Sequence, residues 1–225
     1  MALWLRVREP VIVLVITIAV ALASQRWAGL DTPDSSFYAS LGIWGSEITD
    51  RAPIDSYYFT RLGYIAPVHV LTDVLGIWVG FEAYRVLLLL VFVTGTYLAL
   101  RRFTAIASAA FLTGIVSLST VVLSYFGNSY LTGSVLAGTA AVIAAALFRG
   151  SRPAIIGGAI LGWLAMVNPP GALLAGTLWL AIRIHGRIRV SEVVSAAISS
   201  AVVFGGFLLV VLAMFAGMSW FGAYI

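Results

Sequence analysis

The sequence predicts an all-α polytopic membrane protein with about seven transmembrane helices. Of its residues 61% are hydrophobic and only 10% are charged, whereas a soluble domain is about a quarter charged. Apolar runs of about 20 residues recur along the chain, and each is long enough to cross a ~30 Å hydrocarbon layer as a helix. The arginines fall in short segments between these runs, where membrane proteins concentrate them, so the net charge of +4 does not indicate a nucleic-acid partner.

The first expected span covers Pro10–Ser24. Small residues at its end also fit a signal-peptidase site, but the later spans favour an uncleaved helix. A long polar segment of about residues 26–82 follows. Six further spans are then expected, at Ala83–Leu100, Phe103–Tyr125, Leu131–Phe148, Pro153–Val167, Gly171–Ile184 and Val193–Phe215. The "VNPPG" stretch between the fifth and sixth predicts a tight turn or a re-entrant break, with Asn168 as a capping residue.

Charge predicts the orientation of these spans. With a cytoplasmic N-terminus, nine arginines fall inside and four outside, which is the bias that short loops of membrane proteins show. The inner group is Arg6, Arg8, Arg101, Arg102, Arg149, Arg152, Arg183, Arg187 and Arg189, and the outer group is Arg26, Arg51, Arg61 and Arg85. Among the acids only Glu9 and Glu192 fall inside. We therefore expect a protein of the bacterial plasma membrane whose long loop lies outside.

The long loop begins with the pattern of a helix start. In "TPDSSFYASLG", Thr32 fits an N-cap, Pro33 fits the first helical position, and Asp34 is an acid in the first turn. The helix that follows would carry one apolar stripe in the headgroup region, formed by Phe37, Leu41, Trp44 and Ile48.

A second interfacial helix is expected to begin at Pro67. Its apolar face would be Val68, Leu71, Leu75 and Trp78, while His69 and Asp73 lie four residues apart on its other side. Between the two helices runs a polar segment rich in Asp, Arg and Tyr, much longer than a connector needs. The length and composition of this loop indicate a functional site.

Taken together, "TPDSSFYASLG", "YYFTRLGYIAP" and "VLGIWVGFEAYRVLLLL" resemble the N-terminal module of the GT-C fold glycosyltransferases. The resemblance implies an enzyme that uses polyprenyl-phosphate sugars, with an aspartate of the first external loop as catalytic base, here Asp34. It also implies that residues 1–225 form a single transmembrane module, either the N-terminal part of a longer enzyme or one component of a split one. The acceptor would be an envelope glycan, a glycolipid or a protein.

The chemistry of sugar transfer indicates further candidates. A carboxylate must take the proton of the acceptor hydroxyl, and a cation at the headgroup plane would stabilise the leaving lipid phosphate. Candidates for binding that phosphate are Arg61, Tyr57, Tyr58, His69 and Arg85. Secondary acidic candidates are Asp31, Glu47, Asp50 and Asp55, which also fit solvated loop charges.

No cofactor is expected, although a divalent cation is an open alternative. The sequence has neither a Gly-rich phosphate loop before a helix nor the His and Cys spacings of a zinc site. In the resembling family a second acid often lies between the third and fourth spans, where this chain has Asn128.

Two other functions fit a chain of this kind. A transporter or lipid flippase usually keeps ionisable residues inside its spans, and these spans are nearly free of charge. A non-catalytic scaffold subunit, packed against a partner chain, would suit the small-residue runs "IIGGAILG" and "AAISSAVVFGG". Close packing within one bundle, however, needs the same residues.

Overall fold

Every element in the described part of the chain is a helix, which confirms the all-α prediction. The structure is a computed structural model that describes residues 2–24, 40, 43, 61–127 and 132–215. The helices are α1 (Ala2–Ala23), α4 (Leu62–Leu75), α5 (Ile77–Arg101), α6 (Ile106–Ser117), α7 (Thr120–Gly127), α8 (Thr132–Leu147), α9 (Ser151–Val167), α10 (Pro169–His185) and α11 (Val190–Phe215).

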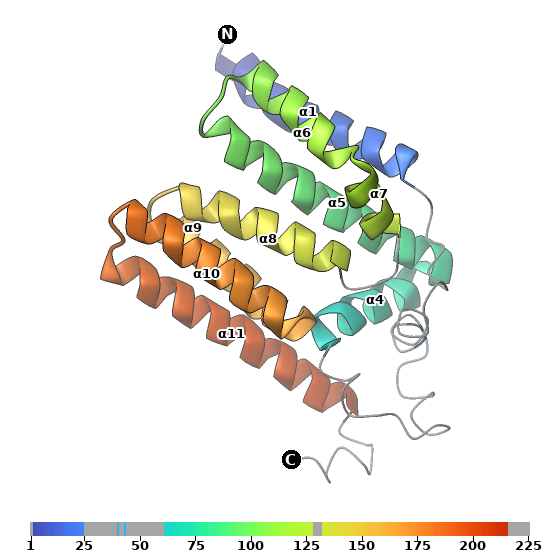
Figure 1. The fold of residues 1–225 in the computed structure, drawn as a ribbon. Coiled ribbons are helices and arrows are strands. Elements are labelled where there is room, and N and C mark those ends of the chain that lie inside the picture. The colour runs from blue at the N-terminus through green and yellow to red at the C-terminus, as the bar shows by residue number, and fades with distance from the viewer. Residues whose placement is uncertain (1, 25–39, 41–42, 44–60, 128–131, 216–225) are drawn as a thin grey trace.

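Successive long helices run in opposite directions, so their connections gather at two ends of a bundle (Figure 1). One end, named the basic end, holds the start of α1 and the connections α5–α6, α8–α9 and α10–α11. The other, named the α4 end, holds the end of α1, the α4–α5 hairpin and the α9–α10 turn. Arg61 and Arg85, which were predicted to lie outside, belong to the α4 end. The nine arginines that were predicted to lie inside belong to the basic end.

The buried side chains form two clusters that share α8 and α9. The larger cluster joins α1 and the helices from α4 to α9, and its fully buried members include Val20, Val68, Leu89 and Val93. Ile43 also packs against this cluster. The smaller cluster joins α8, α9, α10 and α11. Its buried members are Val142, Ala146, Ala154, Leu164, Ala175, Trp179 and Ala196.

Among the residues that the structure describes, two helices are long and apolar enough to cross a membrane: α5, with 25 residues, and the Val190–Leu209 part of α11. A third span results if α6 and α7 count as one, although they meet at a bend of 64°. The helices α8 and α9, with 16 and 17 residues, are shorter apolar helices. At ~1.5 Å per residue they measure about 25 Å, less than the hydrocarbon layer.

The outside of the bundle is apolar over several helices. Leu22 is 80% exposed, and Phe111, Leu173 and Val202 are each more than 60% exposed. Soluble proteins rarely expose continuous apolar surface of this kind. The exposed side chains and the long apolar helices are both consistent with a membrane protein.

The break between α6 and α7 was not expected, since Phe103–Tyr125 was predicted as one span. It lies at the hydroxyl-rich "SLST" stretch of residues 117–120. The side chain of Ser119 accepts a hydrogen bond from the backbone N–H of Val122 at 3.4 Å, which caps the start of α7. Serine and threonine compete with the helical backbone in this way, and so a helix can end where they cluster.

The α4–α5 hairpin also differs from the prediction. The helix expected from Pro67 begins at Leu62, and α5 begins at Ile77, six residues before the expected start at Ala83. The long polar segment therefore ends earlier than residue 82. Gly76 separates the two helices with φ of 81°, a conformation that favours glycine, so Trp78 belongs to α5 rather than to the apolar face of α4.

Helices α9 and α11 pack at very close range through two glycines. A Cβ atom added at Gly158 would lie 2.1 Å from the carbonyl oxygen of Ala196, and one at Gly162 would lie 2.4 Å from that of Ser200. The two glycines are four residues apart and so share one face of α9. Of the two predicted uses for the small-residue runs, packing against a partner chain or packing within one bundle, the structure thus shows the second at these glycines.

The substitution Gly158→Ala is expected to lower the free energy of unfolding by about 1–3 kcal/mol, because the added methyl group forces α9 and α11 apart. The matched control is Gly206→Ala in α11, where an added Cβ meets no atom within 4 Å. Thermal unfolding of both variants in detergent measures the difference. Equal melting temperatures for the two variants would contradict the close contact.

Candidate functional site

The predicted site residues divide into two groups. Asp34, the expected base, lies outside the described residues, as do Asp31, Glu47, Asp50, Asp55, Tyr57 and Tyr58. Their roles stay predictions. Arg61, His69 and Arg85 are described, and all three belong to the α4 end of the bundle.

Arg61 is buried at the start of α4, with 7% of its surface exposed. Its Nη1 atom donates a hydrogen bond to the backbone carbonyl of Val167, the last residue of α9, at 3.2 Å. A cation is favourable there because carbonyl groups at a helix C-terminus carry partial negative charge. One role of Arg61 is therefore to fix α4 against the end of α9.

A second contact between α4 and α9 explains how Pro67 can lie inside a helix. Proline has no N–H, so it cannot donate to the carbonyl of Gly63 four residues earlier. The indole Nε1 of Trp163 donates to that carbonyl at 2.8 Å. This hydrogen bond satisfies the group that proline leaves unpaired, which is why the helix begins at Leu62 rather than at the proline.

Arg85 connects α5 to the end of α1. Its Nη2 and Nε atoms donate to the carboxylate of Glu82 at 2.7 and 3.1 Å, and its Nη1 donates to the hydroxyl of Ser24. Its Nη2 also lies 3.4 Å from the carbonyl of Ala21. Because α5 begins at Ile77, Arg85 lies about two turns inside this helix and not at its mouth, and only 8% of its surface is exposed.

Two tyrosines that the sequence did not single out join the same region. The rings of Tyr64 and Tyr84 meet edge to face with centroids 5.6 Å apart, and the Tyr84 hydroxyl lies 3.1 Å from Oγ of Ser134 on α8. Burial, followed by the neighbouring Tyr84, raises the pKa of the Tyr64 phenol above its ordinary value. This hydroxyl therefore stays protonated at neutral pH and is unsuited to act as a base.

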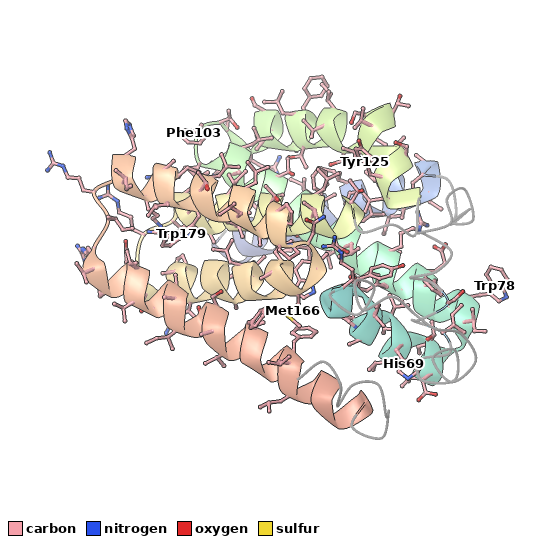
Figure 2. The ribbon with its side chains drawn as sticks, turned by 60° about the horizontal axis from the view of Figure 1, so that its bottom comes forward. His69, Trp78, Phe103, Tyr125, Met166 and Trp179 are labelled. Carbon is pink, nitrogen blue, oxygen red and sulfur yellow. The ribbon has the colours of Figure 1, made fainter. Side chains whose placement is uncertain are left out.

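His69 is half-buried on α4, while Asp73, one turn later, is exposed. On the face predicted to be apolar, Val68 is fully buried, but Leu75 is 43% exposed. Trp78 is 74% exposed and points away from the bundle in Figure 2. The hairpin thus turns apolar side chains outward near His69, which suits contact with the membrane interface.

The described residues of the α4 end supply cations and hydrogen-bond donors but few bases. Of the acids there, Glu82 is paired with Arg85, and Asp73 faces outward. Within the described ranges no three His, Asp or Glu side chains gather as they would around a metal ion. The acidic candidates of the loop are not among those residues, so the divalent-cation alternative stays a prediction.

At the basic end, the structure contains a buried ion pair that the sequence did not predict. Arg183 near the end of α10 and Glu192 near the start of α11 approach to 3.3 Å, with 3% and 6% of their side chains exposed. Glu192 also accepts a hydrogen bond from the N–H of Gly150 at 2.8 Å. An arginine that closes one apolar helix and a glutamate in the first turn of the next were the only signals for this pair.

Comparison of the chain with protein-family models, with curated proteins and with solved structures finds no match.

Proposed function

We propose that this chain is a module of a GT-C glycosyltransferase, which transfers a sugar from a polyprenyl phosphate to an acceptor hydroxyl at the α4 end of the bundle. The proposal includes seven transmembrane segments, with the basic end in the cytoplasm and the α4 end outside. The uneven distribution of arginine supports this orientation. Because α8, α9 and α10 are short, these segments would need a thinned bilayer or flanking polar side chains that extend to the interface.

One observation carries the proposal more than any other. Residues 25–60, which include Asp34 and the other candidate acids, connect Ser24 to Arg61 in the sequence, and both of these residues belong to the α4 end. Arg85, which is buried, hydrogen-bonds to Ser24. The proposal therefore assigns the predicted base to the same end of the molecule as these two buried cations, an arrangement that sugar transfer from a charged lipid requires.

In the proposed reaction the acceptor oxygen attacks the anomeric carbon, and Asp34 takes its proton as the new carbon–oxygen bond forms. The bond from the anomeric carbon to the phosphate oxygen breaks, and the electron pair leaves with the polyprenyl phosphate. Arg61, Tyr57 and Tyr58 would bind that phosphate, with His69 and Arg85 as further partners. A buried guanidinium suits this role because its attraction for an anion is weakly screened by water.

The sugar donor distinguishes the proposed enzyme from transferases that use nucleotide sugars. We expect membranes that contain the chain to transfer sugar from a polyprenyl-phosphate donor and not from a nucleotide sugar. A chelator should leave the rate unchanged, since no metal is assigned to the site. The assay compares labelled lipid donors and nucleotide donors in membranes with and without the chain, with a partner subunit added in a parallel sample. Transfer from the nucleotide sugar alone would contradict the proposal.

A transporter or lipid flippase is the second candidate, and the buried Arg183–Glu192 pair is the observation that favours it. Ionisable residues inside a membrane are costly and often mark transport pathways. However, the pair lies at the basic end of the bundle, where α10 meets α11, and not midway along a helix. We therefore prefer sugar transfer at the membrane surface to transport through the bundle. Uptake of a substrate into vesicles, without sugar transfer, would reverse this preference.

A further inference from the structure

A small cavity lined by both charged and apolar residues lies at the basic end, opposite the end to which sugar transfer is assigned. Its volume is about 220 Å³, below the ~300 Å³ of typical pockets for drug-sized ligands and sufficient for a phosphate group. Three connections bound it, namely α5–α6, α8–α9 and α10–α11. Residues that are far apart in the sequence therefore meet around one space.

The cavity has a clear excess of positive charge. The ionisable residues that line it are Arg102, Arg149, Arg183, His185, Arg187 and Glu192. The single carboxylate is already engaged, because it pairs with Arg183 and accepts the N–H of Gly150. Within the described ranges, neither Arg102 nor Arg187 forms an ion pair with an acid. No acid among the described residues therefore compensates the positive charge of these two guanidinium groups.

Arg183 forms a buried part of the cavity wall. Its side chain is only 3% exposed; its Nη2 donates to the carbonyl of Ala145 at 3.1 Å, and its guanidinium carbon lies 5.5 Å from the ring centre of Trp179. Its Nε, however, has no hydrogen-bond partner among the described residues. A buried donor without an acceptor is unfavourable, and native structures seldom leave one unexplained. Because this nitrogen is shielded from solvent, an anion in the cavity would interact with the guanidinium of Arg183 through its charge and not by accepting a hydrogen bond from Nε.

The backbone at the rim of the cavity is strained in a way that fits a binding site. Arg187 has φ of 62°, and it is the one residue other than glycine with positive φ in the described part of the chain. This conformation is unfavourable for a residue with a side chain and is often found where a ligand is held. Across the cavity, Arg149 donates to the carbonyl of Gly186 at 2.7 Å and so holds the α10–α11 connection against α8–α9.

We propose that this cavity binds the phosphate group of an anionic ligand, of which the headgroup of an anionic phospholipid is the favoured source. The exposed ring of Phe103, 74% accessible, also lines the cavity and lies at the same end of the bundle as Trp179 in Figure 2. An exposed apolar ring beside basic groups suits the boundary between the acyl chains and the headgroup of a lipid, and basic pockets between helices recognise lipid headgroups. The inference depends on membrane placement but not on sugar transfer.

The test uses the full chain in a zwitterionic detergent and three probes: short-chain phosphatidylglycerol, short-chain phosphatidylcholine and inorganic phosphate. Thermal unfolding and calorimetric titration report binding. We expect phosphatidylglycerol to raise the melting temperature and phosphatidylcholine to leave it unchanged. Phosphate that binds as well as phosphatidylglycerol would identify a free phosphate as the ligand and overturn the lipid assignment. Failure of both anions to bind would overturn the site itself.

Two double variants with equal loss of charge separate the cavity from the general field of the basic end. Arg102→Gln with Arg187→Gln removes two guanidinium groups that line the cavity, and affinity for phosphatidylglycerol should fall at least tenfold. Arg152→Gln with Arg189→Gln removes two exposed arginines that do not line it, and affinity should fall less than threefold. All four side chains are exposed, so both variants should unfold at the melting temperature of the ligand-free parent. An equal loss of affinity in the two variants would contradict a built site.

Discussion

Replacing Asp34 with asparagine is expected to lower the rate of sugar transfer by about 10²–10⁴-fold, which is the usual contribution of a positioned general base. Asparagine has nearly the same shape as aspartate but cannot accept the proton of the acceptor hydroxyl. The loss should therefore appear in kcat, while KM for the lipid donor changes little. The measurement is a steady-state assay with a polyprenyl-phosphate sugar in membranes, normalised to the amount of folded chain.

The control for this substitution is Asp31→Asn, three residues earlier. It removes the same charge from the same stretch of loop but matches the family pattern less well than Asp34. We expect it to retain most of the activity. If the two variants lose the same fraction of activity, the loss is due to the reduced negative charge of the loop and not to the removal of a specific base. If Asp34→Asn stays fully active, the assignment of the base is wrong.

A structural role of Asp34 can be distinguished from a catalytic one by stability. As an acid in the first turn of a predicted helix, it would contribute only about 0.3–1 kcal/mol to that helix. Asp34→Asn should therefore unfold within a few degrees of the parent in detergent. A large drop in melting temperature together with lost activity would contradict the catalytic role, because unfolding alone would then explain the inactive enzyme.

The helices of this bundle could be predicted mainly because membrane helices are long apolar runs. Each expected span coincides with a helix, or in one case with the α6–α7 pair. Errors arose where a single side-chain hydrogen bond decides where a helix begins. Ser119 caps α7 inside a predicted span, and Trp163 satisfies the carbonyl of Gly63, so that α4 continues through Pro67. Periodicity contains no signal for a partner a hundred residues away.

The polar contacts of the two ends were harder to predict than the helices. Arg61 and Arg85 were identified as cations near a site, but their contacts to Val167 and Ser24 depend on how α4 packs on α9 and how α5 packs on α1. The pairing of Arg183 with Glu192 was missed for the same reason, since the sequence shows them only as charges of the inner segments. Sequence shows which residues carry charge, and only packing decides which of those charges become buried.

The buried pair gives the second large expected effect. Glu192→Ala should lower the free energy of unfolding by about 3–5 kcal/mol, because removing one partner of a buried ion pair leaves the other charge uncompensated. Arg183 would be left buried with only the carbonyl of Ala145 and the ring of Trp179 near its guanidinium, and the N–H of Gly150 would lose its acceptor. Chemical unfolding in mixed detergent micelles measures the change.

Two comparisons test this explanation of the effect. Glu9→Ala breaks the pair of Glu9 with Arg101, which is also close at 3.2 Å but has about a third of each side chain exposed. This substitution should lower the free energy of unfolding by less than about 1 kcal/mol, because water solvates the charge that remains on Arg101. The double variant Arg183→Met with Glu192→Leu removes both buried charges and should recover most of the stability that Glu192→Ala loses, as apolar replacement of buried pairs often does. If the double variant is as unstable as the single one, the hydrogen bond to Gly150 rather than the charge pair holds α8, α10 and α11 together at the basic end.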